Sequence, residues 1–438
     1  MPATSASSPS PANPRAFAVL GDRDFRLLWI TGWLRNHARF MEVIILGWVV
    51  LELTDSPWRV GLLAFFRMIP VPLLGLASGV LSDRVDRKRV MVATEATSFV
   101  LMTLLFVLVA TDSAEFWSIA IIALGMGIGW VVSFPARNSV IQDMVGTAGI
   151  TKAMSLETAT LAGSRMMGPL YGGLLLNFAG PTEAIFVLTV LYGLDLLLLW
   201  RIHIPPRQAV AHEPVTRVLT EGLRFAISSR LILAVILITI VANVLYFPYM
   251  GMLPVFARDV LGVGPALLGI MAAADGLGAL IGSVFLASRR NIRSPGRIFV
   301  FGTILSMTNI LLFTFSRTYG LSLAILLAAG LSFSGYHSMQ TALVLLSASP
   351  EIRGRALGIQ MMAIGTGPVG QLITGASAET WGAPRAVAMN CAVALVLMAV
   401  ITVSFPAIRR KQTIPGQDAD EAVEGSRPIA GGSQDAEE

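Results

Sequence analysis

The sequence predicts an all-α membrane protein in which twelve transmembrane helices form two pseudo-symmetric six-helix bundles. Three observations predict this class. Of the 438 residues, 54% are hydrophobic and only 13% are charged, whereas a soluble domain carries about 25% charged residues. Twelve mainly apolar stretches are long enough to cross a bilayer, which takes about 20 residues. A hydrophilic stretch separates the first six from the last six, which indicates two halves joined by a linker.

Both ends of the chain are predicted to be disordered. Residues 1–20 are rich in Ser, Pro and Ala. They lack the basic segment and apolar core of a secretory signal, so we expect no cleaved peptide. Residues 408–438 are polar, acidic and Gly-rich. Neither end contains enough apolar side chains to form a packed core.

The first half, residues 21–203, is expected to form one six-helix bundle. Its expected helices are 25–53, 57–81, 90–111, 115–138, 152–177 and 182–203. Residues 204–230 follow as a hydrophilic linker. The stretch "EPVTRVLTEGLRFAISSRLI" alternates apolar and charged residues from Glu213 onward, which indicates an amphipathic helix on the membrane surface.

The second half, residues 231–407, repeats the layout of the first. Its expected helices are 231–257, 265–287, 297–315, 319–346, 355–377 and 384–407. Gly168-Pro169 in "RMMGPLYGGLLLNFAGP" and Gly367-Pro368 in "IGTGPVGQLITGAS" hold matching places in the two halves. Paired Gly/Pro-interrupted helices indicate the binding region of a transporter, and close helix packing is the alternative.

The positions of Lys and Arg predict the topology. An even number of spans puts both termini and the linker on one side, and that side carries most of the basic residues. The loops of the opposite side carry one each, at Arg59, Arg258, Arg317 and Arg385. Because basic loops stay inside, both termini are predicted to be cytoplasmic. The net charge of +5 follows from the same rule and does not indicate nucleic-acid binding.

One loop carries a family motif. "GVLSDRVDRKRVM" lies between the second and third spans and contains Gly79, Asp83, Arg84, Arg87 and Lys88 at the signature spacing. With two similar halves of six spans, the chain resembles the major facilitator superfamily over residues 20–407. The resemblance implies a monomeric rocker-switch transporter in which this loop helps to close the cytoplasmic gate. Asp86 stands where the signature usually has Gly.

Other stretches resemble a branch of bacterial exporters that includes the enterobactin exporters and drug-efflux proteins. They are "LTDSPWRVGLLAFFRMIPVPLLG", "FPARNSVIQDMV" and "SPEIRGRALGI". The resemblance implies a bacterial inner-membrane location. A second motif is similar to the antiporter motif of drug exporters and favours export over import. The motif consists of Ser164, Gly168, Pro169, Gly172 and Gly173. The fourth span departs from those exporters, because it has no Arg before Arg137.

The first span contains charged residues that lipid should exclude. Arg35, Arg39 and Glu42 share one narrow face of a helix that turns about 100° per residue, and His37 lies on the opposite side. A charge in mid-bilayer costs about 2.5–3.5 kcal/mol, so this face is predicted to line a polar cavity. A purely structural ion pair is the alternative for Arg39 and Glu42. Asn36 adds a hydrogen-bonding group.

Further charges are expected at depth in other spans. Arg67 precedes a kink-prone "MIPVP" run. Glu157 and Arg165 share a face but are about 12 Å apart at the helical rise, so each is expected to pair with the first or second span. Asp275 has no basic residue near it on its own helix. It is a candidate proton carrier, because burial without a partner favours the neutral form of a carboxyl group.

These observations together predict a secondary active transporter. The leading hypothesis is a proton-coupled exporter of a small amphipathic or anionic molecule, such as a siderophore-like compound, drug or metabolite. The alternative is an importer or uniporter with the same fold. No nucleotide-binding loop occurs in the sequence, which argues against ATP coupling. A single cysteine and no Ser-His-Asp or His cluster argue against an enzyme, a metal site or a cofactor. The expected partners are the small molecule, protons and membrane lipids.

Overall fold

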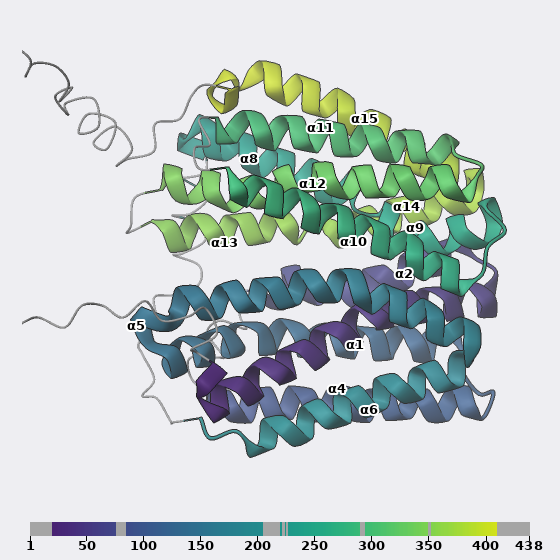
Figure 1. The fold of residues 1–438 in the computed structure, drawn as a ribbon. Helices are drawn as coiled ribbons and strands as arrows, with labels where there is room; N and C mark the ends of the chain where they lie inside the picture. Colours follow the sequence, from purple (N-terminus) through teal and green to yellow (C-terminus); the bar gives the residue numbers. More distant parts are fainter. Residues whose placement is uncertain are drawn as a thin grey trace, which may run out of the picture.

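The computed structural model describes residues 20–75, 85–204, 220, 224, 227–289, 294–348 and 352–409. Throughout these ranges the regular structure is helical, which confirms the predicted all-α class. The expected disordered ends, most of the linker and its expected amphipathic helix lie outside the described residues. Figure 1 shows two groups of roughly parallel helices, one from each half of the chain.

The first group contains five helices in the described ranges. They are α1 (Arg23–Thr54), α2 (Pro57–Met68), α4 (Arg87–Ala110), α5 (Phe116–Phe178) and α6 (Pro181–Arg201). We call the end of the molecule where α6 stops and α8 begins the linker end, and the opposite end the far end. Both ends of α5 lie at the far end, next to the end of α4 and the start of α6. The chain therefore reverses within α5, at Gly146, whose φ of 63° a residue without a Cβ adopts readily.

The second group holds the remaining helices. They are α8 (Arg230–Val241), η2 (Ala242–Tyr246), α9 (Tyr249–Val255), η3 (Phe256–Val260), α10 (Pro265–Ser288), α11 (Pro295–Phe315), α12 (Tyr319–Ser347), α13 (Arg353–Ile364), α14 (Gly367–Trp381), α15 (Ala383–Ser404) and η4 (Pro406–Arg409). The segments from α8 to η3 form one rod, and α13 and α14 form another. With α5 counted as two rods, each predicted span corresponds to one helical rod in the described chain.

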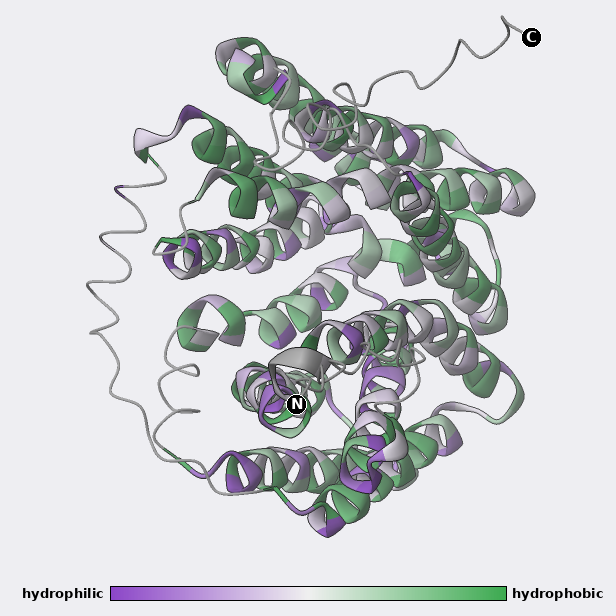
Figure 2. Cartoon of the chain, turned by 60° about the vertical axis from the view of Figure 1, so that its left-hand side comes forward, coloured by the Kyte–Doolittle hydropathy of each residue, from purple (hydrophilic) through white to green (hydrophobic). Residues whose placement is uncertain are grey.

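Ten helices in the described ranges are long and apolar enough to cross a membrane. The first span, α1, and the second rod of α5 are not among them. These two carry Arg35, Arg39, Glu42, Glu157 and Arg165. The outer surface is apolar: Phe178 is 81% exposed and Trp200 is 70% exposed. Figure 2 shows hydrophobic residues predominating along the helices of both halves, as lipid contact requires.

The two halves meet along two pairs of helices. The second helix, α2, packs against α14, and the second rod of α5 packs against α10. Glycines make both contacts close: the Cα of Gly375 lies 2.7 Å from the place of a Cβ on Gly61, and that of Gly269 lies 2.7 Å from the place of a Cβ on Gly173. Small residues at such crossings let membrane helices approach until their backbones touch. Both crossings lie in the far half of the molecule.

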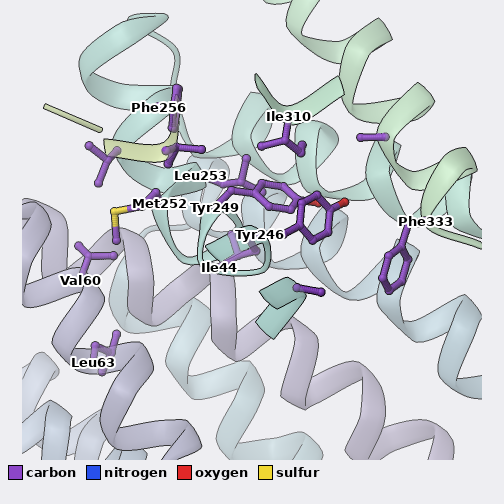
Figure 3. Close-up of a cluster of buried hydrophobic side chains, with 14 of the residues drawn as sticks. Ile44, Val60, Leu63, Tyr246, Tyr249, Met252, Leu253, Phe256, Ile310 and Phe333 are labelled. Atoms are coloured by element: carbon purple, nitrogen blue, oxygen red, sulfur yellow. The ribbon is translucent and has the colours of Figure 1, made fainter. Parts of the chain in front are cut away.

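Apolar side chains from both halves fill the space between these crossings. Figure 3 shows Ile44, Val60 and Leu63 from α1 and α2 facing Met252 and Leu253 from α9. At the linker end α13 packs instead against α8 and α12 of its own half. Contact between the halves is thus concentrated toward the far end.

Candidate functional site

A small cavity with charged lining residues lies in the first half, bordered by the helices of that half. Its volume is about 30 Å³, enough for about two water molecules. All of its lining comes from α1, α2, α4, α5 and α6. The lining residues are Arg35, Arg39, Glu42, Arg67, Glu95, Ser98, Met126, Gly127, Gly129, Trp130 and Tyr192. The structure therefore brings the charged face of α1 together with Arg67 of α2.

Two of the cavity arginines have carboxylate partners. Arg35 donates to Ser133 Oγ at 2.6 Å, and its Nη1 lies 3.5 Å from Glu95 Oε1. Arg67 Nη1 lies 3.6 Å from Glu42 Oε1. These pairs are buried, and hydrogen bonds to neighbouring groups hold them in place.

Hydrogen bonds fix the orientation of Glu42 and Arg67. Tyr192 donates its hydroxyl proton to Glu42 Oε2 at 3.0 Å, and Arg67 donates to the backbone carbonyl of Arg39 at 2.8 Å. Glu42 Oε1 is buried and makes no hydrogen bond within the described structure. It remains able to accept one from a molecule in the cavity.

Arg39 is the arginine without a carboxylate partner in this cavity. Its guanidinium lies 3.7 Å from the centre of the Trp130 ring, a cation–π contact. Its Nη1 is buried and has no hydrogen-bond partner in the described part of the chain. A buried guanidinium nitrogen that donates to nothing is costly. The position is therefore suited to an acceptor that arrives from outside.

The charges that line the cavity do not balance. Three arginines face Glu42 and Glu95. Asp195 on α6 is 1% exposed and is not part of the lining. The lining thus keeps an excess of about one positive charge, which favours an anion.

His37 and Asn36 lie outside this cavity. His37 Nδ1 is 2.8 Å from Ser164 Oγ on α5, and its ring centre lies 4.0 Å from that of Trp33 in a tilted contact. Asn36 is 7% exposed but is not part of the cavity lining. The charged stripe of α1 and its histidine side therefore have different surroundings, one polar and one packed against α5.

Glu157 does not pair with the first or second span, so that expectation was wrong. It accepts from Arg137 Nη2 at 2.8 Å, and the same nitrogen donates to Leu28 O at 2.6 Å. Gly32 makes room for this guanidinium, because a Cβ there would lie 2.0 Å from Arg137 Nη2. The pair ties the two rods of α5 together and to α1. Sequence reasoning missed this pair, because Arg137 stands at the edge of its predicted span.

Arg165 and Asp275 form an ion pair between the two halves. Arg165 Nη2 donates to Asp275 Oδ2 at 2.9 Å, and Tyr249 donates its hydroxyl proton to Oδ1 at 2.9 Å. The Arg165 guanidinium also lies 4.8 Å from the Phe333 ring. Two expectations are corrected here: Asp275 has a cationic partner, and Arg165 pairs with α10 rather than with α1 or α2. Sequence spacing describes one helix and cannot reveal partners on another.

The far end is closed by contacts that cap helix ends across the halves. Glu379 of α14 accepts from Ser56 Oγ and Trp58 N, both at 2.9 Å, where α2 begins. Arg258 of η3 donates to Leu51 O at 2.9 Å, where α1 ends, and pairs with Asp55. A carboxylate at a helix N-terminus and a guanidinium at a C-terminus both complement the helix dipole. The second half thus supplies both caps at the closed end, and the first half supplies both capped helices.

Replacing Glu379 with alanine is expected to loosen the far end. Loss of the cap should cost the closed conformation about 1 kcal/mol, or about fivefold in the open–closed equilibrium. Spin labels at Glu52 and Arg385, one in each half, would report a larger population at long distance. Thr380→Ala is the matched control, because that hydroxyl bonds only within α14. An unchanged distance distribution in Glu379→Ala would exclude the cap as a gate contact.

The signature loop is described only in part. Gly79, Asp83 and Arg84 lie outside the described residues. Arg87 pairs with Asp143 near the end of the first rod of α5, and Lys88 is partly exposed. Asp86 accepts from Arg89 N at 3.0 Å and caps α4, which gives the unusual Asp a local role.

The Gly-Pro motifs lie at helix crossings. A Cβ on Gly168 would be 2.6 Å from Phe40 Cβ, and one on Gly172 would be 3.0 Å from Met41 O, both on α1. Pro169 O lies 2.6 Å from the place of a Cβ on Gly269, across the halves. In the second half, a Cβ on Gly367 would lie 3.2 Å from Met68 Cε on α2. Pro368 follows Gly367 in the first turn of α14. Both motifs therefore serve close packing.

Comparisons with known proteins agree with this architecture. The model of the family described as transmembrane secretion effector matches residues 14–425. The multidrug efflux pump Tap of Mycobacterium tuberculosis is 22% identical over 398 residues, 87% of this chain and 93% of that protein. The staphyloferrin A transporter of Staphylococcus aureus is 23% identical over 408 residues, 91% of this chain and 97% of that protein.

A solved structure shares the fold. It is a bacterial homologue of the human lysosomal transporter Spinster, in an inward-facing and unoccupied conformation. It aligns with a TM-score of 0.68 and 14% identity, covering 92% of this chain and all of that one. This confirms the two-bundle fold that the sequence predicted.

Proposed function

We propose, because the chain belongs to the transmembrane secretion effector family of the major facilitator superfamily, that it is a proton-coupled exporter of a small amphipathic or anionic molecule. It is a multi-pass membrane transporter, and its relatives include efflux pumps and a siderophore transporter. The observation that carries the proposal is the cavity around Arg39, in which a buried guanidinium without a carboxylate partner faces a space bordered by membrane helices.

The cavity suggests the chemistry of the substrate. The free Nη1 of Arg39 would donate to a carboxylate, phenolate or phosphate oxygen, which forms a charge-assisted hydrogen bond. Trp130 beside it offers an aromatic face to an apolar part of the same molecule. With a volume of about 30 Å³ the cavity holds only one functional group of the substrate, so the rest extends toward the second half as the halves separate.

Transport would proceed by alternating access. The closed far end and the packing of α13 on its own half fit a state that opens toward the linker end. Rocking would then separate the glycine crossings at Gly173 and Gly375 and open the far end. We place both termini and the linker end in the cytoplasm of a bacterium, with the chain in the inner membrane as a monomer, on the basis of its basic loops.

Proton coupling would act through Asp275. Its carboxylate is held by Arg165 of the other half and by Tyr249 of its own. A proton arriving on Asp275 would remove the charge that Arg165 needs and weaken the contact between the halves. Binding of the proton could therefore drive the opening at the far end, and its release could drive the return to the conformation closed at that end.

The proposal is tested by flux in both directions. Untargeted metabolite comparison of cells with and without the gene identifies the exported compound. Its flux is then measured in right-side-out and inverted vesicles, with and without an uncoupler. Accumulation by inverted vesicles that an uncoupler stops supports proton-driven export. Flux that ignores the uncoupler would reject proton coupling, and uptake by right-side-out vesicles would indicate the importer or uniporter alternative.

Arg39→Ala is expected to weaken binding of an anionic substrate by about tenfold or more, because a charge-assisted hydrogen bond contributes about 1.5–3 kcal/mol. Glu42→Gln should have a smaller effect on affinity, since it preserves the acceptor oxygen. Flux in inverted vesicles, measured against substrate concentration, checks both. Arg59→Ala is the control, because that arginine lies outside the cavity. Equal affinity in the Arg39 and Arg59 variants would remove Arg39 from the binding site.

A further inference from the structure

A second cavity lies on the outer surface of the second half, at the linker end. It has a volume of about 530 Å³ and is open to the outside. Its lining comes from the first three turns of α11 and from η4, which follows α15 at the end of the described chain (Figure 1). The lining residues are Arg297, Val300, Phe301, Ile304, Pro406 and Arg409.

The groove is held by a tight contact between η4 and α11. Ile408 is fully buried, and a Cβ on Gly296 would lie 1.9 Å from Ile408 O. Arg297 Nε donates to Arg409 O at 2.9 Å. The glycine and this hydrogen bond fix η4 against α11. The two arginines are therefore held at neighbouring positions at the mouth of the groove.

The mouth and the floor of the groove differ in chemistry. Both arginines are exposed, and within the described ranges neither has a carboxylate partner. Below them the lining is apolar, and Phe301 is 67% exposed. Phe301 and Ile304 lie one and two helical turns further from the linker end than Arg297, about 5.4 Å per turn. Two cations at one end of an apolar strip complement an amphipathic anion.

We propose that this groove binds an anionic phospholipid from the leaflet at the linker end. The phosphodiester group would accept hydrogen bonds from Arg297 and Arg409, and one acyl chain would lie along Val300, Phe301 and Ile304. A basic residue near anionic lipid contributes about 1 kcal/mol, and the apolar strip adds contact that free phosphate cannot make. The occupant would hold η4 on α11, and so anchor the end of α15 at the membrane surface.

The test uses the full-length protein purified in a neutral detergent. Phosphatidylglycerol and phosphatidylcholine are titrated separately, and bound lipid is counted by native mass spectrometry. The variant Arg297→Gln/Arg409→Gln is compared with Arg317→Gln/Arg385→Gln, which removes two exposed arginines at the far end. Circular dichroism checks that both variants fold. We expect the first variant to bind phosphatidylglycerol about thirtyfold more weakly, at about 1 kcal/mol per arginine, and the second to bind as the parent does.

Two further measurements distinguish binding of a lipid phosphate from binding of free phosphate. Inorganic phosphate at equal concentration should not displace the lipid, and dihexanoyl phosphatidylglycerol, with short chains, should bind more weakly than the long-chain lipid. Equal losses in the two double variants, equal binding of phosphatidylcholine, or displacement by inorganic phosphate would each overturn the proposal.

Discussion

Asp275→Asn is expected to abolish proton-driven efflux while the protein remains in the membrane. Asparagine keeps the shape of the side chain and can still accept from Tyr249, but it cannot take up or release a proton. Arg165 loses its counter-charge, and breaking one side of a buried pair costs about 3–5 kcal/mol. The contact between the halves should weaken accordingly. The effect is measured as the accumulation of substrate inside inverted vesicles, with and without a proton gradient.

Glu157→Gln is the matched control for this result. It also removes a buried carboxylate from an arginine, but its partner Arg137 belongs to the same half. We expect it to lower thermal stability and to keep the response to the proton gradient. The double variant Arg165→Gln/Asp275→Asn should recover stability without recovering coupling. Full proton-driven efflux by Asp275→Asn would show that the pair is only a structural contact.

Gly173→Val is expected to prevent the far end from closing. A Cβ at this position would lie 2.4 Å from Pro265 O and 2.7 Å from Gly269 Cα, and both are backbone atoms that cannot move aside locally. Overpacking of this kind costs about 1–3 kcal/mol, or roughly five- to 150-fold in the equilibrium. The conformation with the far end open should therefore become the more populated one, and efflux should stop.

Access to the far end can be measured by labelling an introduced cysteine, because the chain has a single cysteine of its own. Cys391 is fully buried, so a membrane-impermeant reagent does not reach it. A cysteine introduced by Val60→Cys then reports the far end, because Val60 is 2% exposed at the contact between the halves. A membrane-impermeant maleimide should label it about tenfold faster when Gly173→Val is present. Gly163→Val, on the same helix, has no atom within 4 Å of its Cβ and should leave labelling unchanged. Equal rates would mean that the crossing does not control access.

The sequence predicted the spans well because membrane helices follow from local composition. Apolar length located each rod, and the break within α5 followed from two separate apolar stretches. The same reasoning placed Arg35, Arg39 and Glu42 on one face of α1, since helical geometry relates residues on the same rod. Those three side chains line one cavity in the structure.

The partners of these charges could not be predicted in this way. Glu95 and Tyr192 reach the cavity from α4 and α6, and Trp130 reaches it from α5. The charge of Glu95 marks it as unsuited to lipid, but nothing in the local sequence separates Tyr192 or Trp130 from residues that face lipid. The pairing of Arg165 with Asp275 depends on how two halves dock, which involves residues 110 positions apart. Contacts between rods require the rotation and tilt of each rod, and a single sequence does not contain them in readable form.

The bond between Arg137 and Glu157 joins the two rods of α5 and anchors them to α1. Trp130 belongs to the first rod and Arg165 to the second, so a substrate touching one is mechanically linked to the other. The first half should then move as a rigid body, and the cavity should keep its shape in both the inward-open and the outward-open conformation. The substrate would be released because water enters the cavity, rather than because the lining residues rearrange.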